Sequence, residues 1–375
     1  MPAEQSPTAR ARIRMVDLFA GPGGLDVAAR WLGIDVHGVE WDSDACATRG
    51  LADLETKQGD VYDYGPDDFR DDDASEQPDL TILAGGPPCQ TYTVAGNGAG
   101  RGELDRVLGM VDRMINRETM EAAHAELHEK TGDERTGLVL EPLRWAIEAF
   151  DAEKPYDVIV LEQVPAVLPV WKAIGEALTK IGYQYACEIL HTEEFGVPQT
   201  RRRAILIASR LGSPVMPAAT HRRYRKGTRQ HEGSAELLPW VSMGTALKRE
   251  NFSVRSNYGT GGDPKARGER SWEEPSATVT GKISRNRLKD TKTGAELDRF
   301  TAGEAGQLQT FPPDYPWSGR NTAQQIGNAI PPRLATHVLA AALGMTFDTA
   351  ALDKAVEGKW KDTRGGVISL SPIGE

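Results

Sequence analysis

The sequence predicts an α/β fold, in which a parallel sheet with helices on both faces is followed by a smaller second domain. Short apolar segments alternate with helical patterns over the first 209 residues, as is typical of strands joined by crossover helices. The alternation stops after Ser209, where Gly, Pro and charged residues become frequent. A helical pattern resumes at Ile326–Leu343. We expect this last segment to return to the sheet.

Each expected strand is a short apolar segment. The strands lie at Ile13–Phe19, Ile34–Val39, Asp79–Ala84, Tyr156–Leu161 and Ala204–Ser209. Helices are expected after the first strand to about Leu32, at 138–150 and at 167–181. The resulting division is a tail (1–12), a first domain (13–209, completed by 322–349), a second domain (210–321) and a C-terminal tail (350–375).

Composition narrows the class of protein. The chain has 375 residues, of which 39% are hydrophobic and 26% charged, as in globular proteins. No segment approaches the ~20 apolar residues that span a bilayer, and the polar N-terminus lacks a signal core, so we expect no membrane partner. Cys46, Cys89 and Cys187 are too few and too scattered for a disulfide framework or a zinc site. We therefore expect no bound metal and a location in the reducing cytoplasm.

Charge is distributed unevenly along the chain. The net charge of −10 by itself disfavours a polyanionic partner. Residues 201–300, however, hold 21 Lys and Arg against 10 Asp and Glu, a net of +11, which leaves 23 against 44, a net of −21, elsewhere. Within a stretch free of acidic residues, Arg222, Arg223 and Arg225 surround Tyr224. A run of this kind is also compatible with a solvated loop, but the asymmetry favours a basic surface that binds phosphates.

Cys89 lies on a stiff turn after a strand. Residues 85–90 are Gly-Gly-Pro-Pro-Cys-Gln, directly after an apolar segment. The carboxyl ends of parallel strands border the crevice in which α/β proteins bind ligands, and the prolines hold the thiol in one direction. An isolated cysteine is more often a small core residue. The flanking prolines and Gln90 favour a functional thiol, and the segment 94–136 that follows is expected to act as a lid.

A glycine-rich turn follows the first strand. Phe19-Ala-Gly21-Pro-Gly23-Gly places glycines before a helix N-terminus, where the backbone can approach a carboxylate or phosphate. The spacing differs from the GxGxxG of dinucleotide-binding turns, so a nicotinamide cofactor is not expected. A purely structural turn is an equal alternative to a ligand-binding turn. Glu40, at the end of the second strand, can accept bonds from ribose hydroxyls. Trp41 can stack on adenine and Asp60 can contact its amino group, so an adenosine-bearing ligand such as S-adenosylmethionine is expected.

Two further polar groups lie at strand ends. Glu162 follows the strand Tyr156–Leu161, where partial burial near a thiol would raise its pKa and suit it to donate a proton. A surface glutamate that caps a helix is the alternative. Gln199, Arg201 and Arg203 alternate before the strand 204–209 and are expected to share one face. Such aligned donors suit an anion or a carbonyl group.

These motifs resemble, in order, those of bacterial and phage DNA cytosine-5 methyltransferases. The resemblance runs from Asp17 to about Leu343. It comprises the Phe-Ala-Gly-x-Gly-Gly turn, Pro-Cys-Gln, the glutamate turn and Gln-x-Arg-x-Arg. It continues through 301–312 and closes with Gln-Ile-Gly-Asn-Ala-Ile-Pro-Pro at 325–332. The implied fold is the Rossmann-like sheet of S-adenosylmethionine-dependent methyltransferases, with 210–321 as a target-recognition domain.

The resemblance also implies a role for each matching residue. Cys89 would add to C6 of cytosine, Glu162 would hold or protonate N3, and Arg203 would bind O2, with Arg201 steadying the intermediate or the loop. The residues expected to line the cofactor pocket are Phe19, Gly21, Gly23, Glu40, Trp41, Asp60 and Asn328. Those expected to contact nucleic acid are Gln90, Gln199, Arg222, Arg223, Arg225 and Thr278. The target base must be flipped out of the duplex.

One departure from the family pattern concerns Gln163, where the family has asparagine. Glu162 is retained, so the proton chemistry is expected to stand, while the bond from the amide to the nucleophile loop stays open. We expect a monomer that binds duplex DNA, with any cognate restriction endonuclease acting separately. An RNA cytosine methyltransferase is the alternative, and a non-catalytic DNA-binding descendant is a third. The large basic region favours DNA, and the retained thiol favours catalysis.

Overall fold

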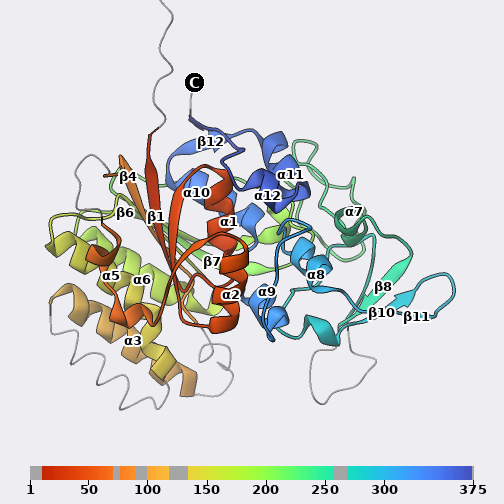
Figure 1. Cartoon of the computed structure of the whole chain (residues 1–375), viewed down its shortest axis with the longest axis horizontal. Coiled ribbons are helices and arrows are strands. Elements are labelled where there is room, and N and C mark those ends of the chain that lie inside the picture. The colour runs from red at the N-terminus through yellow and green to blue at the C-terminus, as the bar shows by residue number, and fades with distance from the viewer. Residues whose placement is uncertain (1–10, 71–76, 89–98, 118–133, 257–267, 374–375) are drawn as a thin grey trace, which may run out of the picture.

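The first domain is built on a seven-stranded sheet with the order β3-β2-β1-β4-β5-β7-β6 (Figure 1). This computed structural model describes residues 11–70, 77–88, 99–117, 134–256 and 268–373. The strands are β1 (Ile13–Leu18), β2 (Asp35–Glu40), β3 (Glu55–Gln58), β4 (Leu80–Gly85), β5 (Val158–Gln163), β6 (Gln184–His191) and β7 (Arg202–Ser209). The strand order reverses between β1 and β4, and this is where ligands bind in sheets of this kind.

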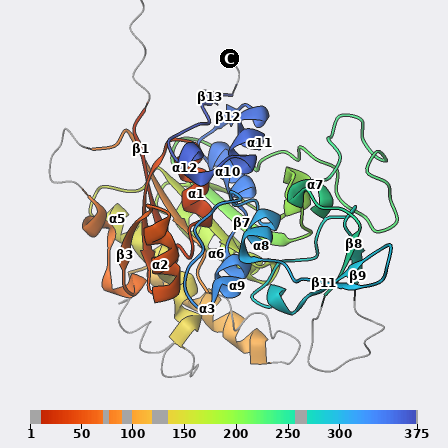
Figure 2. The same ribbon diagram turned by 45° about the vertical axis from the view of Figure 1, so that its right-hand side comes forward.

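Helices cover both faces of the sheet. On one face, α1 (Gly24–Trp31) and α10 (Pro332–Ala342) pack into one apolar core. On the other, α3 (Ala99–Ile115), α5 (Glu141–Asp151) and α6 (Leu168–Thr179) form a second core (Figures 1 and 2). The helix α2 (Ser43–Leu51) joins β2 to β3. The predicted α/β architecture is confirmed, as are the five expected strands.

The expectation of an all-parallel sheet is wrong at one strand. β7 runs antiparallel to both of its neighbours, β5 and β6. The connection from β6 to β7 spans only residues 192–201, which is too short for the crossover that parallel strands need. β3 and β6 escaped the sequence analysis because most of their residues are not buried.

The second domain contains a four-stranded antiparallel sheet with the order β11-β10-β8-β9. Its elements are α7 (Met243–Leu247), β8 (Phe252–Arg255), β9 (Glu269–Ser271), β10 (Arg287–Asp290), β11 (Glu296–Leu297), α8 (Ala302–Leu308) and α9 (Thr322–Asn328). Phe252, Val254 and Leu288 form its own apolar core. Ile326 of α9 packs into this core, although we had assigned 322–349 to the first domain.

The segment expected to be a C-terminal tail is instead folded against the first domain. It contains α11 (Thr349–Glu357), α12 (Trp360–Thr363) and β13 (Leu370–Pro372), which pairs with β12 (Met345–Phe347). Trp360 is buried and donates its indole N–H to the carbonyl of Ala52 at 2.9 Å. Trp31 donates in the same way to Thr363 Oγ1 at 3.2 Å. Apolar burial therefore makes this segment part of the domain. Residues 1–10 of the expected N-terminal tail lie outside the described residues.

Candidate active site

The turn after β1 has the backbone geometry that its glycines predict. Phe19, Gly21 and Gly23 all have positive φ angles, of 58°, 54° and 103°. A Cβ atom at Gly23 would lie 2.9 Å from the hydroxyl of Tyr315, so a side chain is excluded there by space as well as by conformation. α1 begins at the next residue, Gly24. The N-terminus of this helix therefore faces the carboxyl ends of the strands.

Glu40 is held by backbone amides at the end of β2. Its carboxylate accepts from the N–H groups of Gly21 (2.7 Å), Trp41 (2.9 Å) and Asp42 (2.8 Å). Burial raises the pKa of Glu40, while these three bonds act in the opposite direction. The bond to Gly21 ties the glycine turn after β1 to β2. The carboxylate thus has one orientation, which suits a fixed acceptor for hydroxyl groups.

Three other expected cofactor residues are also placed near this turn. Trp41 follows β2, and its side chain is 73% exposed. Gly59 donates its N–H to the carbonyl of Glu40 at 3.0 Å, which places Asp60 beside the Glu40–Trp41 pair. Asn328 is exposed at the end of α9, two residues before Ile330, whose carbonyl lies directly against Gly24. Residues far apart in the sequence therefore meet at one edge of the sheet.

The turn that leads to Cys89 begins in the same crevice. Gly86 donates its N–H to the carbonyl of Leu18 at 3.3 Å, so the end of β4 lies against the end of β1. A Cβ atom at Gly86 would lie 3.3 Å from Glu162 Oε2. The backbone just before Cys89 is therefore next to the glutamate. Cys89 and Gln90 themselves lie outside the described residues.

Glu162 and Arg203 form a buried ion pair. Glu162 is 6% exposed, and its Oε1 contacts Nε of Arg203. The next residue, Gln163, donates its side-chain amide to the carbonyl of Pro87. The bond that the sequence analysis left open is thus made by the longer side chain. A carboxyl, a guanidinium and the turn at 86–88 that precedes Cys89 lie together at one sheet edge.

The expected lid is only partly described. Residues 94–98 and 118–133 lie outside the described part. The helix α3 within this stretch buries Val107, Met110, Val111 and Met114 in a core of the first domain. These residues are structural, so the whole segment 94–136 does not act as one lid.

The two described cysteines are not suited to nucleophilic attack. Burial raises the pKa of Cys187 to about 12 and that of Cys46 to about 11, with the negative charge of Glu40 adding to the effect at Cys46. Because the thiolate is the nucleophile, both thiols would be unreactive at neutral pH. Cys89 remains the candidate.

Gln199 and Arg201 hold the two domains together. Gln199 is fully buried, donates to Gln309 Oε1 at 2.7 Å and accepts from the N–H of Val279 at 2.7 Å. Arg201 is also buried and donates to the carbonyls of Val279 (2.8 Å) and Gly327 (2.9 Å). The expectation that Gln199 contacts nucleic acid is therefore corrected, because its amide is occupied inside the protein. Arg201 binds one carbonyl in the loop at Val279 and one near the end of α9, and its expected role at the site stays a prediction.

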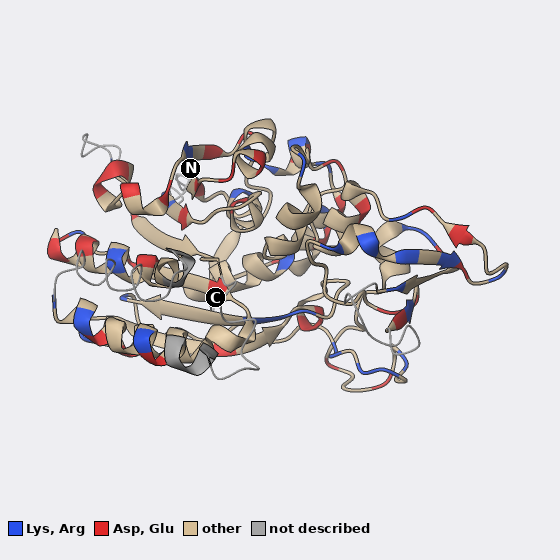
Figure 3. Cartoon of the chain, turned by 90° about the horizontal axis from the view of Figure 1, so that it is seen from below, with Lys and Arg blue, Asp and Glu red and all other residues tan. Residues whose placement is uncertain are grey.

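Of the other residues expected to contact nucleic acid, some bind protein groups and some are exposed. Arg222 donates to the carbonyls of Ser234 and Gln230, and Arg223 pairs with Glu194 at 3.0 Å. Thr278 donates to the carbonyl of Thr200 at 2.8 Å. Arg225 is exposed. Figure 3 shows Lys and Arg along the sheet and the loops of the second domain. Arg222 and Arg223 thus shape the loop, which leaves Arg225 as the most available cation of the three.

A buried charged cluster beneath the glycine turn after β1 escaped the sequence analysis. Arg49 of α2 forms two bonds with Asp26 of α1, at 2.6 and 2.9 Å, and all of these atoms are inaccessible to solvent. Asp17 of β1 is buried beside them, and burial together with the charge of Asp26 raises its pKa well above the ordinary value. An acidic residue within the apolar pattern of α1 was the available signal. The cluster locks α1 to α2 below the turn.

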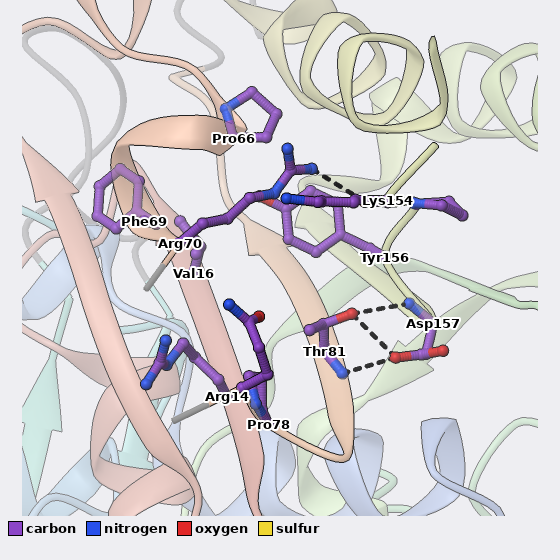
Figure 4. Close-up of a pocket in the computed structure, with 12 residues that line it drawn as sticks. Arg14, Val16, Pro66, Phe69, Arg70, Pro78, Thr81, Lys154, Tyr156 and Asp157 are labelled. Atoms are coloured by element: carbon purple, nitrogen blue, oxygen red, sulfur yellow. Dashed lines mark hydrogen bonds between the residues drawn. The ribbon is translucent and has the colours of Figure 1, made fainter. Parts of the chain in front are cut away.

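A separate cavity of about 210 Å³ lies at the amino ends of the strands (Figure 4). Arg14, Arg70, Lys154 and Tyr156 contribute to its lining. Arg70 donates to the carbonyl of Lys154, and Asp157 accepts from Thr81, so its polar groups are largely matched (Figure 4). Because it lies at the opposite edge of the sheet, this cavity is not part of the crevice at the carboxyl ends of the strands. Among the described residues, no cluster could hold a metal ion, and no helix has the length and apolar character to cross a membrane.

Comparison with known proteins identifies the family. The model of the C-5 cytosine-specific DNA methylase family matches residues 13–115 and 125–343. The chain belongs to this family. It is a DNA (cytosine-5-)-methyltransferase, as the order of its motifs predicted. The match ends at residue 343, so β12, α11, α12 and β13 lie beyond it.

The relatives of this methyltransferase include bacterial enzymes of similar length. It is 26% identical over 362 residues to the Type II methyltransferase M1.HphI of Haemophilus parahaemolyticus, covering 88% of this chain and 86% of the other. It is also 26% identical over 363 residues to M.NgoFVII of Neisseria gonorrhoeae, covering 85% and 83%. Among solved structures, the S. pombe Dnmt2 methyltransferase has a TM-score of 0.55 at 17% identity, covering 88% of this chain and 98% of that one. This likeness supports the fold.

Proposed function

We propose that this methyltransferase transfers a methyl group to C5 of a flipped cytosine in duplex DNA, through a covalent bond between Cys89 and C6. The observation that carries the proposal is the meeting of three features at one sheet edge. These are the turn at 86–88 that precedes Cys89, the Glu162–Arg203 pair and the glycine turn after β1. A nucleophile, an acid and a cofactor turn are the parts that this reaction requires.

The described residues fit an adenosyl cofactor. The exposed indole of Trp41 offers an apolar face at the end of β2, and the carboxylate of Glu40 is fixed beside it. Gly21 and Gly23 allow a ligand to approach the backbone before α1. Phe19, Asp60 and Asn328 complete the proposed site around this edge. S-adenosylmethionine, the methyl donor that the family implies, would supply an electrophilic methyl group when bound.

The side chains of the crevice divide the remaining work. The thiolate of Cys89 adds to C6, which makes C5 nucleophilic toward the methyl group. Glu162 holds or protonates N3, and Arg203 binds the O2 carbonyl, so that both offset the charge that develops on the ring. A base then removes the C5 proton, and the electrons of that bond expel the thiolate from C6. Arg201 supports the loops around this pocket.

The second domain is proposed to bind the DNA. Its excess of cations suits a phosphate backbone, and Arg225, Thr278 and Gln90 are the proposed contacts. We further propose a monomer that acts in the cytoplasm. It would serve a restriction–modification system, with a separate endonuclease, or phage self-protection. Two relatives are named Type II methyltransferases, and another is named an orphan methyltransferase of Bacillus phage SPbeta.

An RNA substrate is the second candidate, and the observations favour DNA over it. The matched family is described by its action on DNA. The second domain also has its own apolar core and a basic stretch, as expected of a domain that reads a duplex. Methylation of matched DNA and RNA oligonucleotides, measured with a tritiated methyl group, distinguishes the two. Bisulfite sequencing of DNA from expressing cells then reports the sequence context.

A covalent trap tests the proposed mechanism. Duplex DNA with 5-fluorocytosine at the target should form an adduct with Cys89 that depends on the cofactor, because fluorine cannot leave as the C5 proton does. Cys89→Ser should abolish both the adduct and methyl transfer while still binding S-adenosylhomocysteine. Cys187→Ser is the matched control and should retain activity. An adduct that persists in the Cys89→Ser variant would refute the assigned nucleophile.

A further inference from the structure

Tyr315 reaches the cofactor turn from a distant part of the sequence. Its hydroxyl donates to the backbone carbonyl of Pro22, 293 residues earlier. The ring is 4% exposed. It packs against Phe311, Trp317 and Trp360, with ring centroids 4.8, 5.0 and 5.7 Å away. Three neighbouring aromatic rings thus hold the phenol of Tyr315 in one position.

The cofactor turn is held from two sides. On one side, the N–H of Gly21 is bound by Glu40 at 2.7 Å. On the other side, the carbonyl of Pro22 is bound by Tyr315. Gly21 and Gly23, which flank Pro22, both have positive φ angles, and glycine samples many other conformations when nothing restrains it. The two bonds therefore limit how the turn can move.

The segment that carries Tyr315 is anchored to both domains. Its neighbour Trp317 packs against the core of the first domain and against that of the second. A Cβ atom at Gly306 of α8 would lie 2.8 Å from Trp317 Nε1, so the indole lies close against that helix. The backbone N–H of Trp360 donates to Asp314 Oδ1 at 2.7 Å, which ties the segment to α12 as well. Tyr315 is consequently as fixed as the cores around it.

We propose that Tyr315 is a positioning residue for cofactor binding, acting through its hydrogen bond to the carbonyl of Pro22. The inference rests on the proposed function, since it assigns the turn to an adenosyl cofactor. Without the hydroxyl, the turn samples conformations that do not bind the ligand. The apparent dissociation constant then equals the intrinsic one divided by the fraction of protein whose turn is in the binding conformation. The chemical step, which occurs at Cys89 and Glu162, is not directly altered.

A purely structural tyrosine is the competing explanation, and the chain offers a matched control for it. Tyr183 is also buried, and its hydroxyl donates to the backbone carbonyl of Tyr156 at 2.6 Å. This bond lies at the amino ends of the strands, away from the cofactor turn. Tyr315→Phe and Tyr183→Phe each remove one hydroxyl from a buried carbonyl. A structural role predicts the same outcome for both, namely a lower melting temperature and unchanged cofactor affinity.

The experiment measures binding and catalysis on the full chain. Calorimetry with S-adenosylhomocysteine, without DNA, should give a dissociation constant about tenfold higher for Tyr315→Phe, because only roughly a tenth of the protein would then hold the turn in the binding conformation. The KM for S-adenosylmethionine should rise similarly, while kcat and the KM for duplex DNA should stay within about twofold of wild type. Tyr183→Phe should match wild type in all four quantities.

Each outcome has a distinct meaning. An affinity of Tyr315→Phe within about twofold of wild type overturns the inference, as does an equal loss in Tyr183→Phe. Failure of the wild-type protein to bind S-adenosylhomocysteine would instead refute the proposed function.

Hydrogen exchange of the wild-type protein provides a test that needs no variant. S-adenosylhomocysteine should slow exchange in peptides from 13–32 and 309–318 together, and leave a peptide that covers 181–185 unchanged. Protection of the first peptide alone would contradict the inference, because the turn would then respond independently of Tyr315.

Discussion

Gln163 binds the backbone of the nucleophile turn at Pro87, two residues before Cys89. Its amide N–H donates to the carbonyl of Pro87, while its Oε1 accepts from the N–H of Val164 at 2.6 Å. The side chain thus joins the end of β5 to the end of β4. The longer amide makes, in this chain, the connection that the family's asparagine is expected to make.

Gln163→Ala should lower kcat by about 10- to 100-fold, because a small misplacement of a nucleophile costs about that much. Binding of S-adenosylhomocysteine should be unchanged, since the cofactor turn lies on another strand. Gln163→Glu retains the length and an acceptor for Val164 but loses the donor, so it should be impaired as well. Gln184→Ala, on the edge strand β6, is the control. Full activity in Gln163→Ala would show that the prolines alone hold the turn.

Arg49→Met should destabilise the protein by roughly 3–5 kcal/mol, as expected when one partner of a buried ion pair is removed. The carboxyl groups of Asp17 and Asp26 would then remain buried without the guanidinium. Arg14→Met, which breaks a more exposed pair with Asp35, should cost no more than about 1 kcal/mol. Urea unfolding measures both, and equal losses would contradict the special role of burial.

Trp360→Ala should destabilise the protein by roughly 3–5 kcal/mol, the usual range for a buried tryptophan. The indole fills a core position and donates to the carbonyl of Ala52. Trp41→Ala, at an exposed indole, should change stability by no more than about 0.5 kcal/mol. Chemical denaturation distinguishes the two. A negligible effect of Trp360→Ala would mean that the segment beyond 343 is dispensable for the fold.

The free energy of unfolding should decrease as the pH is lowered from about 6.5 to 4, because of His221. Burial, followed by the positive charge of Arg333, lowers the pKa of His221 to about 4, while Asp353 acts in the opposite direction. As the pH falls below 6.5, the unfolded chain takes up the proton before the folded protein does, so unfolding becomes more favourable. Buried His337, with its pKa lowered to about 3, acts in the same direction.

His221→Gln should therefore lose less stability than wild type over this range. The free energy of unfolding from urea titrations at several pH values provides the measurement. Parallel pH profiles for the two proteins would exclude the assigned contribution of His221.

The sequence alone determined the α/β class, five strands, the position of the glycine turn after β1 and the identity of the family. These properties depend on local patterns: apolar segments that form strands, glycines that permit positive φ angles, and motifs at strand ends. The family resemblance implied separate roles for Glu162 and Arg203 on one base, which stay predictions, and the structure pairs the two side chains.

Only the tertiary structure decided which polar residues serve the site and which hold the protein together. Gln199, Arg201 and Arg203 alternate in the sequence, yet their side chains have different partners. Gln199 binds Gln309 and Val279, and Arg201 binds the carbonyls of Val279 and Gly327. Arg203 pairs with Glu162. Burial against a distant segment produces this difference. The antiparallel β7, the folded C-terminal segment and the bond from Tyr315 to Pro22 escaped prediction for the same reason: each depends on contacts between residues far apart in the chain.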